Sequence, residues 1–398
     1  MLIKEISPND YIEFTDQVDQ YPFLNKIEFC HVLQSVGYKT LLLGMYDEDE
    51  LVAVTWAFEQ KIFLGKILKL ITGVLVSDSQ VRSLFYKALI DYSHKHHYSV
   101  LSVMVDGDQR IYNYEGELIK ELDSELLQLM PEFGYDHELS KESRLDGMPT
   151  FQYLKDLSDF MPDDAKGLLK SFNNNSQRNI KKAKKLGIQV KELTYDDLDT
   201  FKEITQETAD RQGFSDKSLT YFQSFYKLFK DQVEFLQAEI HLPSAIKGLE
   251  ERIQALNPDK KNDQQQIASL ETDVEILQEL YQEQGQESLA LANMLMVYLP
   301  HEATYFIGGS VTEFQKLPAP FLLQYEAMLR TLKRRINKYN FYGINGDFDG
   351  SDGVLRFKQN FNGYIVEKIG NYVYYPQPRR YRLIKSIKDL ANRLLGRS

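Results

Sequence analysis

Cysteine is almost absent from this sequence of 398 residues: Cys30 is the only one, so an internal disulfide cannot form. That usage is typical of proteins in a reducing compartment. The sequence also lacks any apolar run near the roughly 20 residues that cross a bilayer. Residues 1–8 carry neither an apolar signal core nor a small-residue cleavage site. Together these absences predict a cytoplasmic protein.

Motifs for nucleotides and metals are missing as well. Neither a Walker loop nor a G-x-G-x-x-G turn occurs. The acidic stretch 347–353 looks like a calcium loop, but its glycine is displaced, and Lys358 stands where the loop requires its final glutamate. No carboxylate or cysteine completes a metal site with His94, His96 and His97, which favours an exposed helix end. We therefore expect neither a metal nor a cofactor.

Positive charge is scarce over the chain as a whole, which has a formal net charge of −11. This balance argues against attraction of the whole surface for nucleic acid. Two segments depart from it. Residues 166–191 contain eight lysines and arginines and no acid, and residues 377–398 contain seven and one acid. Their placement predicts local contacts with phosphate groups.

The two halves of the sequence show the same succession of strands and helices. In the first half, strand-like runs and one helix, after Ser77-Asp78-Ser79, follow the order 41–45, 51–58, 67–76, helix, 98–105. In the second half the corresponding segments are 233–240, 289–299, 304–310, a helix at 320–335, and 339–344. A duplicated βββαβ order predicts an α/β (α+β) protein of two acyltransferase units of the GNAT type.

A segment with coiled-coil spacing interrupts the second unit. Apolar residues recur at intervals of three and four over 246–256 and 267–281, and Asn257-Pro258-Asp259 breaks the pattern. The spacing predicts an antiparallel helical hairpin over 241–287, which projects as an arm because it has no second apolar face. The expected domains are therefore 1–155 for the first unit and 156–240 with 288–369 for the second. Residues 370–398 are expected to pack back on the first unit.

Three segments, residues 169–188, 210–222 and 340–363, resemble the Fem-type (FemABX) peptidoglycan aminoacyltransferases. The stretch 349–366 is most similar to the branch-extending MurN type. The resemblance implies that an aminoacyl-tRNA, Ala-tRNA for this type, donates an amino acid to lipid II or to its mono-aminoacylated form. Alanine would be the second residue of the bridge. Acetyl-CoA is disfavoured, because residues 314–320 cannot form the amide nest with which GNAT enzymes hold pyrophosphate.

The resemblance also implies site residues. Lys358 matches the family lysine that stabilises the oxyanion during acyl transfer, and Phe357 matches the aromatic residue that packs beside it. The alternative for Lys358 is a solvated loop charge in a glycine-rich segment. Lys217 stands where the family commonly has an arginine for the phosphate or carboxylate of the acceptor, and Arg211 is the alternative.

Further substrate-binding candidates are Tyr305, before a Gly-Gly pair, and Asp106, at the end of the first-half strand 98–105. Each has a purely structural alternative. The N-terminal substrate lysine of the family does not carry over, because Leu33 occupies its position. We therefore expect the acceptor site to differ in the first unit.

Two basic segments suggest contacts with phosphate-bearing partners. Arg178, Lys181, Lys182 and Lys185 lie on one predicted helix, which together with the hairpin would suit tRNA phosphates; a solvated basic face is the alternative. Residues 382–397 alternate basic and apolar positions at helical spacing. This pattern suits an anionic membrane surface, so we expect a peripheral location on the cytoplasmic membrane.

Three other functions remain open at this stage. The same chemistry could place the first residue, alanine, serine or glycine, on the stem lysine. A tRNA-binding or scaffold protein could have kept the fold without activity. A CoA-dependent acetyltransferase is the third alternative. The sequence identifies neither a protein partner nor the oligomeric state.

Overall fold

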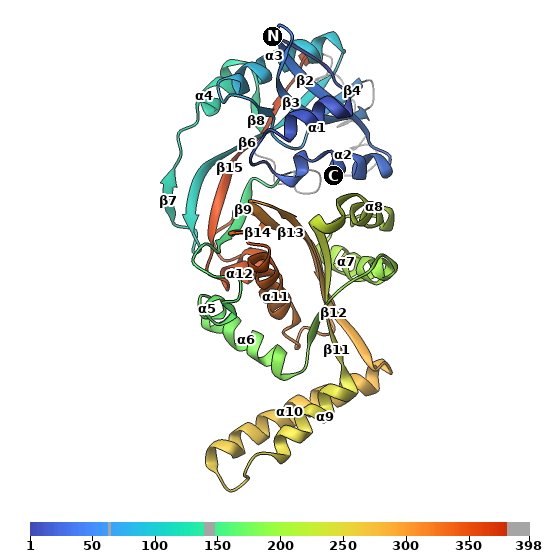
Figure 1. The fold of residues 1–398 in the computed structure, drawn as a ribbon, viewed down its shortest axis with the longest axis vertical. Coiled ribbons are helices and arrows are strands. Elements are labelled where there is room, and N and C mark those ends of the chain that lie inside the picture. The colour runs from blue at the N-terminus through green and yellow to red at the C-terminus, as the bar shows by residue number, and fades with distance from the viewer. Residues whose placement is uncertain (63–64, 139–147, 380–398) are drawn as a thin grey trace. The chain divides into compact units, whose positions relative to one another are not determined.

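The computed structural model describes residues 1–62, 65–138 and 148–379. The chain divides into two compact units. Unit 1 consists of Met1–Leu154, Tyr342–Leu355 and the described chain from Tyr364 onward, and unit 2 consists of Lys155–Phe341 and Arg356–Gly363. Each unit is a sheet with helices packed on it (Figure 1).

Unit 1 is built on the sheet order β1-β2-β3-β4-β6-β15-β9, with β5 on β3, β7 on β6 and β8 on β15. Its strands are β1 (Leu2–Glu5), β2 (Lys39–Asp47), β3 (Glu50–Ile62), β4 (Gly65–Leu70), β5 (Leu75–Val76), β6 (Val100–Asn113), β7 (Leu118–Glu121), β8 (Asp136–Glu138), β9 (Phe151–Asp156) and β15 (Tyr364–Tyr374). Its helices are α1 (Pro8–Thr15), η1 (Phe23–Asn25), α2 (Ile27–Ser35), α3 (Val81–Lys95) and α4 (Glu125–Glu132).

The core of unit 1 forms where α3 covers the sheet. Phe85, Tyr86 and Leu89 of α3 are fully buried in one cluster with apolar residues of β2, β3, β4 and β6. The face expected from helical spacing contained Leu84, Phe85 and Leu89; the structure buries Phe85 and Leu89, whereas Leu84 is 42% exposed and Tyr86 is buried instead. His94, His96 and His97 stand at the C-terminal end of α3, as predicted.

Three details of unit 1 differ from the sequence prediction. The expected strand 67–76 is split into β4 and β5, because the chain leaves the sheet after Leu70. The N-cap position of α3 is Gln80 and makes no side-chain cap bond; Asp78 accepts a hydrogen bond from the Gln80 amide at 2.9 Å instead. The expected strand 98–105 runs on to Asn113 as β6, so Asp106 lies within a strand and not at its end.

Unit 2 is built on the sheet order β14-β13-β12-β11-β10. Its strands are β10 (Gln189–Glu192), β11 (Val233–His241), β12 (Ser288–Leu299), β13 (Glu302–Ser310) and β14 (Lys338–Ile344, of which Lys338–Phe341 belong to this unit). Its helices are α5 (Ala165–Lys170), α6 (Asn174–Lys185), η3 (Tyr195–Asp197), α7 (Leu198–Gln212), α8 (Leu219–Phe229), η4 (Lys230–Gln232), α9 (Leu242–Gln254), α10 (Lys261–Gln284), α11 (Ala319–Lys333) and α12 (Gly353–Gln359, of which Arg356–Gln359 belong to this unit).

Helices cover both faces of the unit 2 sheet. Figure 1 shows α11 on one face and α7 and α8 on the other. Strands β11 and β12 between them are buried along nearly their whole length, as expected for strands covered on both faces. Glu234 of β11 is a buried acid, held by Arg330 at 3.4 Å and Arg334 at 2.9 Å from α11 and its C-cap.

A parallel strand pair separates in the described part of each unit. In unit 1, Ile67–Leu70 of β4 pair with Val100–Val103 of β6, after which β4 ends and β6 continues. In unit 2 the parallel register joins Ala303 and Thr304 to Tyr339 and Asn340, while β13 runs on to Ser310. Asp106 therefore lies where β6 continues beyond the end of β4, and Tyr305 directly follows the last parallel pair of β13 and β14.

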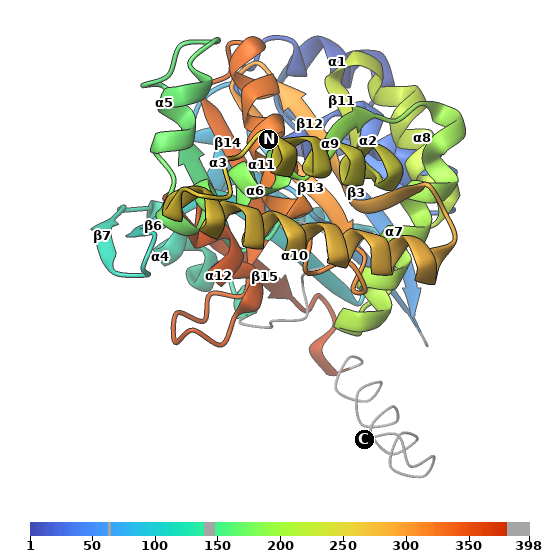
Figure 2. The same cartoon turned by 90° about the horizontal axis from the view of Figure 1, so that it is seen from below.

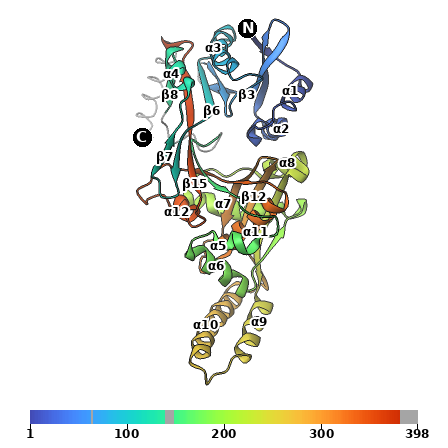
Figure 3. The ribbon, with the colours of Figure 1, turned by 60° about the vertical axis from the view of Figure 1, so that its left-hand side comes forward.

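The predicted hairpin is confirmed as α9 and α10, joined across Pro258 (Figure 2). Figures 1 and 3 show the pair extending away from the sheet of unit 2. Leu249, Leu270, Val274 and Leu277 of the predicted apolar seam are buried. Gly285 ends α10 in a left-handed conformation, with φ of 63°, that glycine adopts without strain.

Candidate active site

Lys358 lies on the short helix α12 and is 4% exposed. Asp352 caps the start of this helix, because its carboxylate accepts hydrogen bonds from the Val354 and Leu355 amides at 2.8 and 3.1 Å. The acidic stretch that looks like a calcium loop therefore has a structural use as a helix cap. The alternative of a solvated loop charge at Lys358 is wrong, since a lysine in this place is enclosed by protein.

Five phenylalanines of unit 2 surround the α12 segment. The ring of Phe361 lies 5.5 Å from that of Phe357, 5.2 Å from Phe341 and 5.2 Å from Phe172, and Phe321 lies 5.2 Å from Phe357. We call this set the phenylalanine cluster. It keeps water away from the helix that carries Lys358, and a charge acts more strongly in such a medium.

A second lysine, Lys155, lies beside the phenylalanine cluster and has no counterpart in the sequence predictions. It is 5% exposed, and burial lowers its pKa to about 8. Its ammonium lies 5.4 Å from the centre of the Phe172 ring and donates to the Asn362 carbonyl at 3.2 Å. The sequence carries no signal for it, because half of the residues of β9 (FQYLKD) are polar and a lysine near the end of such a strand is expected to be solvated.

Tyr305 is half-buried on β13, and burial raises its pKa to about 12. The missing side chain of Gly308 makes room for its hydroxyl, because a Cβ at that position would overlap it. Burial raises the pKa of Tyr339, and nearby Tyr298 and Tyr305 raise this pKa further. The Tyr339 ring lies 4.9 Å from the ring of Phe341 in the phenylalanine cluster. The first glycine of the pair noticed in the sequence thus leaves space for Tyr305, whereas the second, Gly309, lies against Ile204 and Thr208 of α7.

Arg211, at the end of α7, is held at the far end of β13. Its guanidinium donates to the Ser310 carbonyl at 3.1 Å and to the Thr312 hydroxyl. Because these contacts use part of its hydrogen-bonding fork, Arg211 has a structural role here whether or not it also binds substrate.

Lys217 lies in the loop between α7 and α8, 5.7 Å from the centre of the Tyr221 ring. The preceding residue, Asp216, fixes this loop. Its side chain is 4% exposed and accepts hydrogen bonds from Lys202 at 2.6 Å and Thr205 at 2.7 Å on α7. The loop therefore has a charged anchor directly beside Lys217.

Replacing Asp216 by asparagine is expected to loosen this loop. The amide cannot offer the negative charge that Lys202 meets, and a hydrogen bond to a charged group contributes about 1.5–3 kcal/mol. Amide hydrogen exchange over residues 213–218 should become about 10–100-fold faster. Asp210→Asn on the exposed face of α7 is the matched control. Unchanged exchange in Asp216→Asn would show that Asp216 does not anchor the loop.

The four cations predicted to meet phosphates, all on α6, fall into two pairs. Lys182 and Lys185 form ion pairs with Asp273 of α10 at 3.3 and 3.2 Å. Arg178 and Lys181 are exposed, and within the described ranges neither makes an ion pair. The second pair is thus available to a partner, whereas the first attaches the hairpin to α6.

The hairpin itself has little positive charge to offer. Residues 242–284 contain nine acids and four bases, a net charge of −5. Lysine and arginine supply most of the electrostatic attraction for phosphates, so this balance disfavours binding of nucleic acid along the arm. Arg178 and Lys181 are therefore the predicted phosphate contacts that the structure favours.

Asp106 belongs to unit 1, whereas the other predicted site residues belong to unit 2. Lys368 of β15 pairs with it at 3.3 Å and with Asp108 at 2.8 Å. Gly73 packs so close that a Cβ there would overlap the Asp106 side chain. These contacts give Asp106 a structural place between β6, β15 and the loop after β4.

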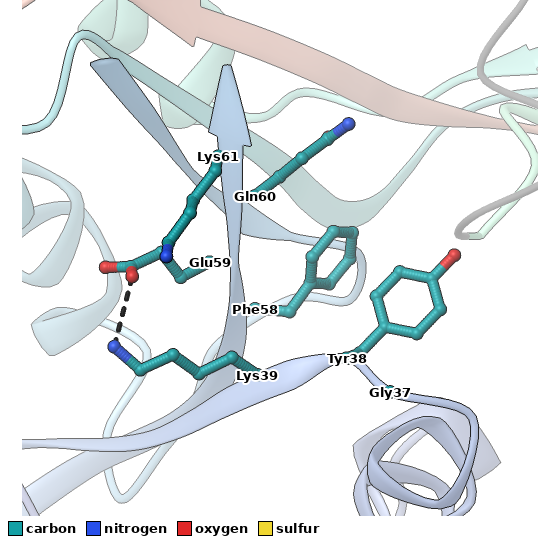
Figure 4. Close-up of a pocket in the computed structure, with 7 residues that line it drawn as sticks. All are labelled: Gly37, Tyr38, Lys39, Phe58, Glu59, Gln60 and Lys61. Carbon is teal, nitrogen blue, oxygen red and sulfur yellow. Dashed lines mark hydrogen bonds and ion pairs between the residues drawn. The ribbon is translucent and has the colours of Figure 1, made fainter. Parts of the chain in front are cut away.

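Leu33, at the position of the missing family lysine, is buried on α2. A cavity of about 370 Å³ opens beyond the end of this helix, lined by residues of β2 and β3 (Figure 4). Lys61 and the Lys39–Glu59 ion pair, at 3.0 Å, lie around it, and the Tyr38 and Phe58 rings stand side by side. None of the predicted site residues lines this cavity.

Two solved structures define the class of fold. The crystal structure of FemX superposes with a TM-score of 0.71 at 19% identity, covering 96% of this chain and 100% of that one. A tandem GNAT protein from the clavulanic acid biosynthesis pathway gives a TM-score of 0.51 at 8% identity, covering 94% and 98%. The fold is therefore that of the tandem GNAT-like acyltransferases, as predicted from the sequence.

The FemAB family model matches residues 6–389, and the chain belongs to this family. Curated relatives include the aminoacyltransferase FemA of Staphylococcus aureus strain RF122, which is 25% identical over 98% of this chain and 99% of that protein. FemA of strain N315 matches to the same extent. The resemblance drawn from the three sequence segments is thus confirmed at the level of the family.

In the part of the chain that the structure describes, no helix is both long and apolar enough to cross a membrane.

Proposed function

We propose that this protein is an aminoacyltransferase of peptidoglycan bridge synthesis, which moves an amino acid from an aminoacyl-tRNA to an amine of a lipid-linked muropeptide. The observation that carries the proposal is the enclosed Lys358 on α12, beside the phenylalanine cluster. Membership of the FemAB family supports the same reaction.

The reaction needs no covalent enzyme intermediate, because the ester of a charged tRNA is already activated. The acceptor nitrogen attacks the ester carbon and loses a proton, the bond to the ribose oxygen breaks, and that oxygen leaves with a proton. Negative charge develops on the carbonyl oxygen between these events. An ammonium fixed at that oxygen in a site of low dielectric stabilises it without acting as a base. We assign this task to Lys358, with Phe357 shaping the site.

The acceptor side of the proposal involves two groups of residues. Lys217, on the loop that Asp216 anchors, would meet a phosphate or carboxylate of the muropeptide. Tyr305 would lie along the separated part of β13, with its hydroxyl kept neutral by burial. Arg211 would support the end of β13 through its contacts with Ser310 and Thr312. Asp106, which belongs to unit 1, is a separate candidate for substrate binding.

We further propose alanine as the donated residue and a branch with one residue attached as the acceptor. The experiment is transfer of labelled amino acids from a panel of charged tRNAs to two lipid-linked acceptors, one with the bare stem lysine and one with that branch. Transfer of alanine only to the branch supports the second step. Transfer to the bare lysine would support the proposed reaction but show that the stem lysine is the acceptor. Transfer to neither acceptor would favour a non-catalytic tRNA-binding protein.

Phosphate binding by α6 can be tested with charge reversal. Arg178→Glu with Lys181→Glu should weaken binding of charged tRNA and reduce the slope of log K against log salt by about 0.7–0.9 for each phosphate that the protein no longer neutralises. Lys182→Met with Lys185→Met is the comparison, since those lysines already pair with Asp273. Equal tRNA affinity and equal salt slope in the first variant and the wild type would remove α6 from the tRNA site.

The C-terminal segment completes the proposal. Residues 380–398 lie outside the described chain, so its predicted helix and its packing on unit 1 rest on the sequence alone. A basic amphipathic segment would hold the enzyme at the anionic cytoplasmic surface, where a lipid-linked acceptor is presented. Flotation with vesicles of anionic and of neutral lipid, with and without residues 380–398, tests this location.

A further inference from the structure

Lys155 is a buried charge without a counter-charge. Within residues 1–62, 65–138 and 148–379, no carboxylate lies at ion-pair distance from its ammonium. Lysine is almost never buried to this extent unless it is paired, and burial disfavours its charged form. Because burying this ammonium costs free energy, we expect Lys155 to have a role that an apolar side chain at the same position could not fill.

The Lys155 ammonium contacts the turn that follows α12, the helix that carries Lys358. Its Nζ donates to the Asn362 carbonyl at 3.2 Å. The Asn362 amide donates to the Gln359 carbonyl at 3.1 Å, and the Phe361 amide donates to the Lys358 carbonyl at 3.0 Å. Lys155 thus lies at the carbonyl of the residue that ends the turn after α12, and an ammonium is held by a carbonyl dipole more strongly than a neutral amine is.

Amide side chains attach the same turn to α6 and to the residue after α5. Asn362 Nδ2 donates to the Ser171 carbonyl at 3.0 Å, and Asn173 Nδ2 donates to the Asn360 side chain at 3.0 Å. These bonds are neutral. Lys155 is the charged member of the set, and its aliphatic stem reaches past Phe172, whose ring packs on Phe361.

We propose that Lys155 is a positioning residue, whose ammonium fixes the α12 turn so that Lys358 is held at the reacting carbonyl oxygen. The inference rests on the proposed function, since it assumes transfer at Lys358. Misplacement by about 1 Å costs on the order of 10²-fold in rate, so the turn has to be held closely. Lys155 acts through the Asn362 carbonyl and needs no contact with substrate.

This role makes transfer sensitive to pH. Burial lowers the pKa of Lys155 to about 8, so the ammonium is present below that pH and is lost above it. Charged groups on the elements around it are Asp156 on β9, Glu367 and Lys368 on β15, Lys338 on β14, Lys170 beside Phe172, and Arg356 and Lys358 on α12. Asp156 raises the pKa but does not offset burial. The neutral amine keeps a hydrogen bond to Asn362 but loses the attraction between charge and dipole.

Stability responds in the opposite direction. Between the folded pKa of about 8 and the usual value of 10.5, the unfolded chain binds a proton that the folded chain has released. Unfolding therefore becomes harder as pH rises through this window. Lys155→Met removes the buried charge and this pH dependence, and it is expected to leave the protein at least as stable at neutral pH. If Lys155 served only to stabilise the fold, Lys155→Met would instead be less stable than the wild type at neutral pH.

The test compares wild type, Lys155→Met and Lys155→Gln with Lys333→Met, an exposed lysine of α11, as the control. We expect Lys155→Met to lower kcat about 10–100-fold with KM for acceptor and tRNA nearly unchanged. Its kcat profile from about pH 6.5 to 9.5 should lack the decline that wild type shows above pH 8. Lys155→Gln, which can donate a neutral hydrogen bond, should fall between the two, and Lys333→Met should match wild type.

Hydrogen exchange of residues 353–362 gives a readout independent of activity. After correction for intrinsic rates, protection in wild type should fall as pH rises above 8, and Lys155→Met should be unprotected at every pH. Equal kcat, pH profile and exchange in Lys155→Met and wild type would overturn the inference. Absence of transfer in wild type would contradict the proposed function instead, and exchange would still decide whether Lys155 holds the turn.

Discussion

Replacing Lys358 by methionine is expected to lower kcat for aminoacyl transfer by about 10²–10³-fold, the loss seen when one donor to an oxyanion is removed. Methionine has nearly the length of lysine and suits a site that is 4% exposed, so the fold should persist. Binding of charged tRNA should be unchanged, because the lysine acts on charge that develops only in the transition state. Single-turnover transfer and tRNA binding, measured on the same samples, separate these effects.

Lys333→Met is again the matched control, as an exposed lysine in the same unit. Loss of tRNA binding together with transfer in Lys358→Met would contradict a transition-state role, since the lysine would then contribute to binding the donor. Transfer that survives the substitution would move the oxyanion contact to another group. Retained binding in a wild type that shows no transfer would favour the non-catalytic alternative.

Replacing Phe361 by alanine is expected to reduce the free energy of unfolding by about 3–5 kcal/mol, the cost of removing a buried phenylalanine side chain. The ring is fully buried and packs against the rings of Phe172, Phe321, Phe341 and Phe357. A cavity in this place would both destabilise unit 2 and release the α12 turn. Urea denaturation followed by a probe in unit 2 measures the loss.

Phe361→Leu should cost less, because it fills part of the space that alanine leaves empty. Met161→Ala, at a side chain that is 73% exposed, is the control and should change stability by no more than about 0.5 kcal/mol. A destabilisation in Phe361→Ala no larger than in Met161→Ala would show that the phenylalanine cluster does not hold unit 2 together.

The sequence predicted those elements whose residues repeat at a regular period. The spacing of Leu249, Leu270 and Leu277 predicted the hairpin, and the apolar face of α3 predicted the helix that covers unit 1. The extension of β6 could not be foreseen, because Asp106, Asp108 and Arg110 read as loop residues. Their charges are tolerated within a strand since Lys368 and Glu367 of β15 pair with them across 257 or more residues of sequence.

The site was predicted in part because a motif identifies residue types but not their partners. Lys358 was chosen from the resemblance, yet its burial depends on phenylalanines from four separate segments. Lys182 and Lys185 read as free cations until the hairpin brought Asp273 against them. Lys155 went unassigned because its partner is a backbone carbonyl, which no pattern of side chains reveals.

The position of β15 sets the order in which the protein can be completed during synthesis. This strand lies between β6 and β9 in the sheet of unit 1, although the ribosome makes it after nearly all of unit 2. Until then β6 and β9 present unpaired edges, which are prone to mistaken pairing and aggregation. The N-terminal unit is thus begun first and finished last. A truncation before Tyr364 should therefore damage the fold of the N-terminal unit, even though that part of its sequence is intact.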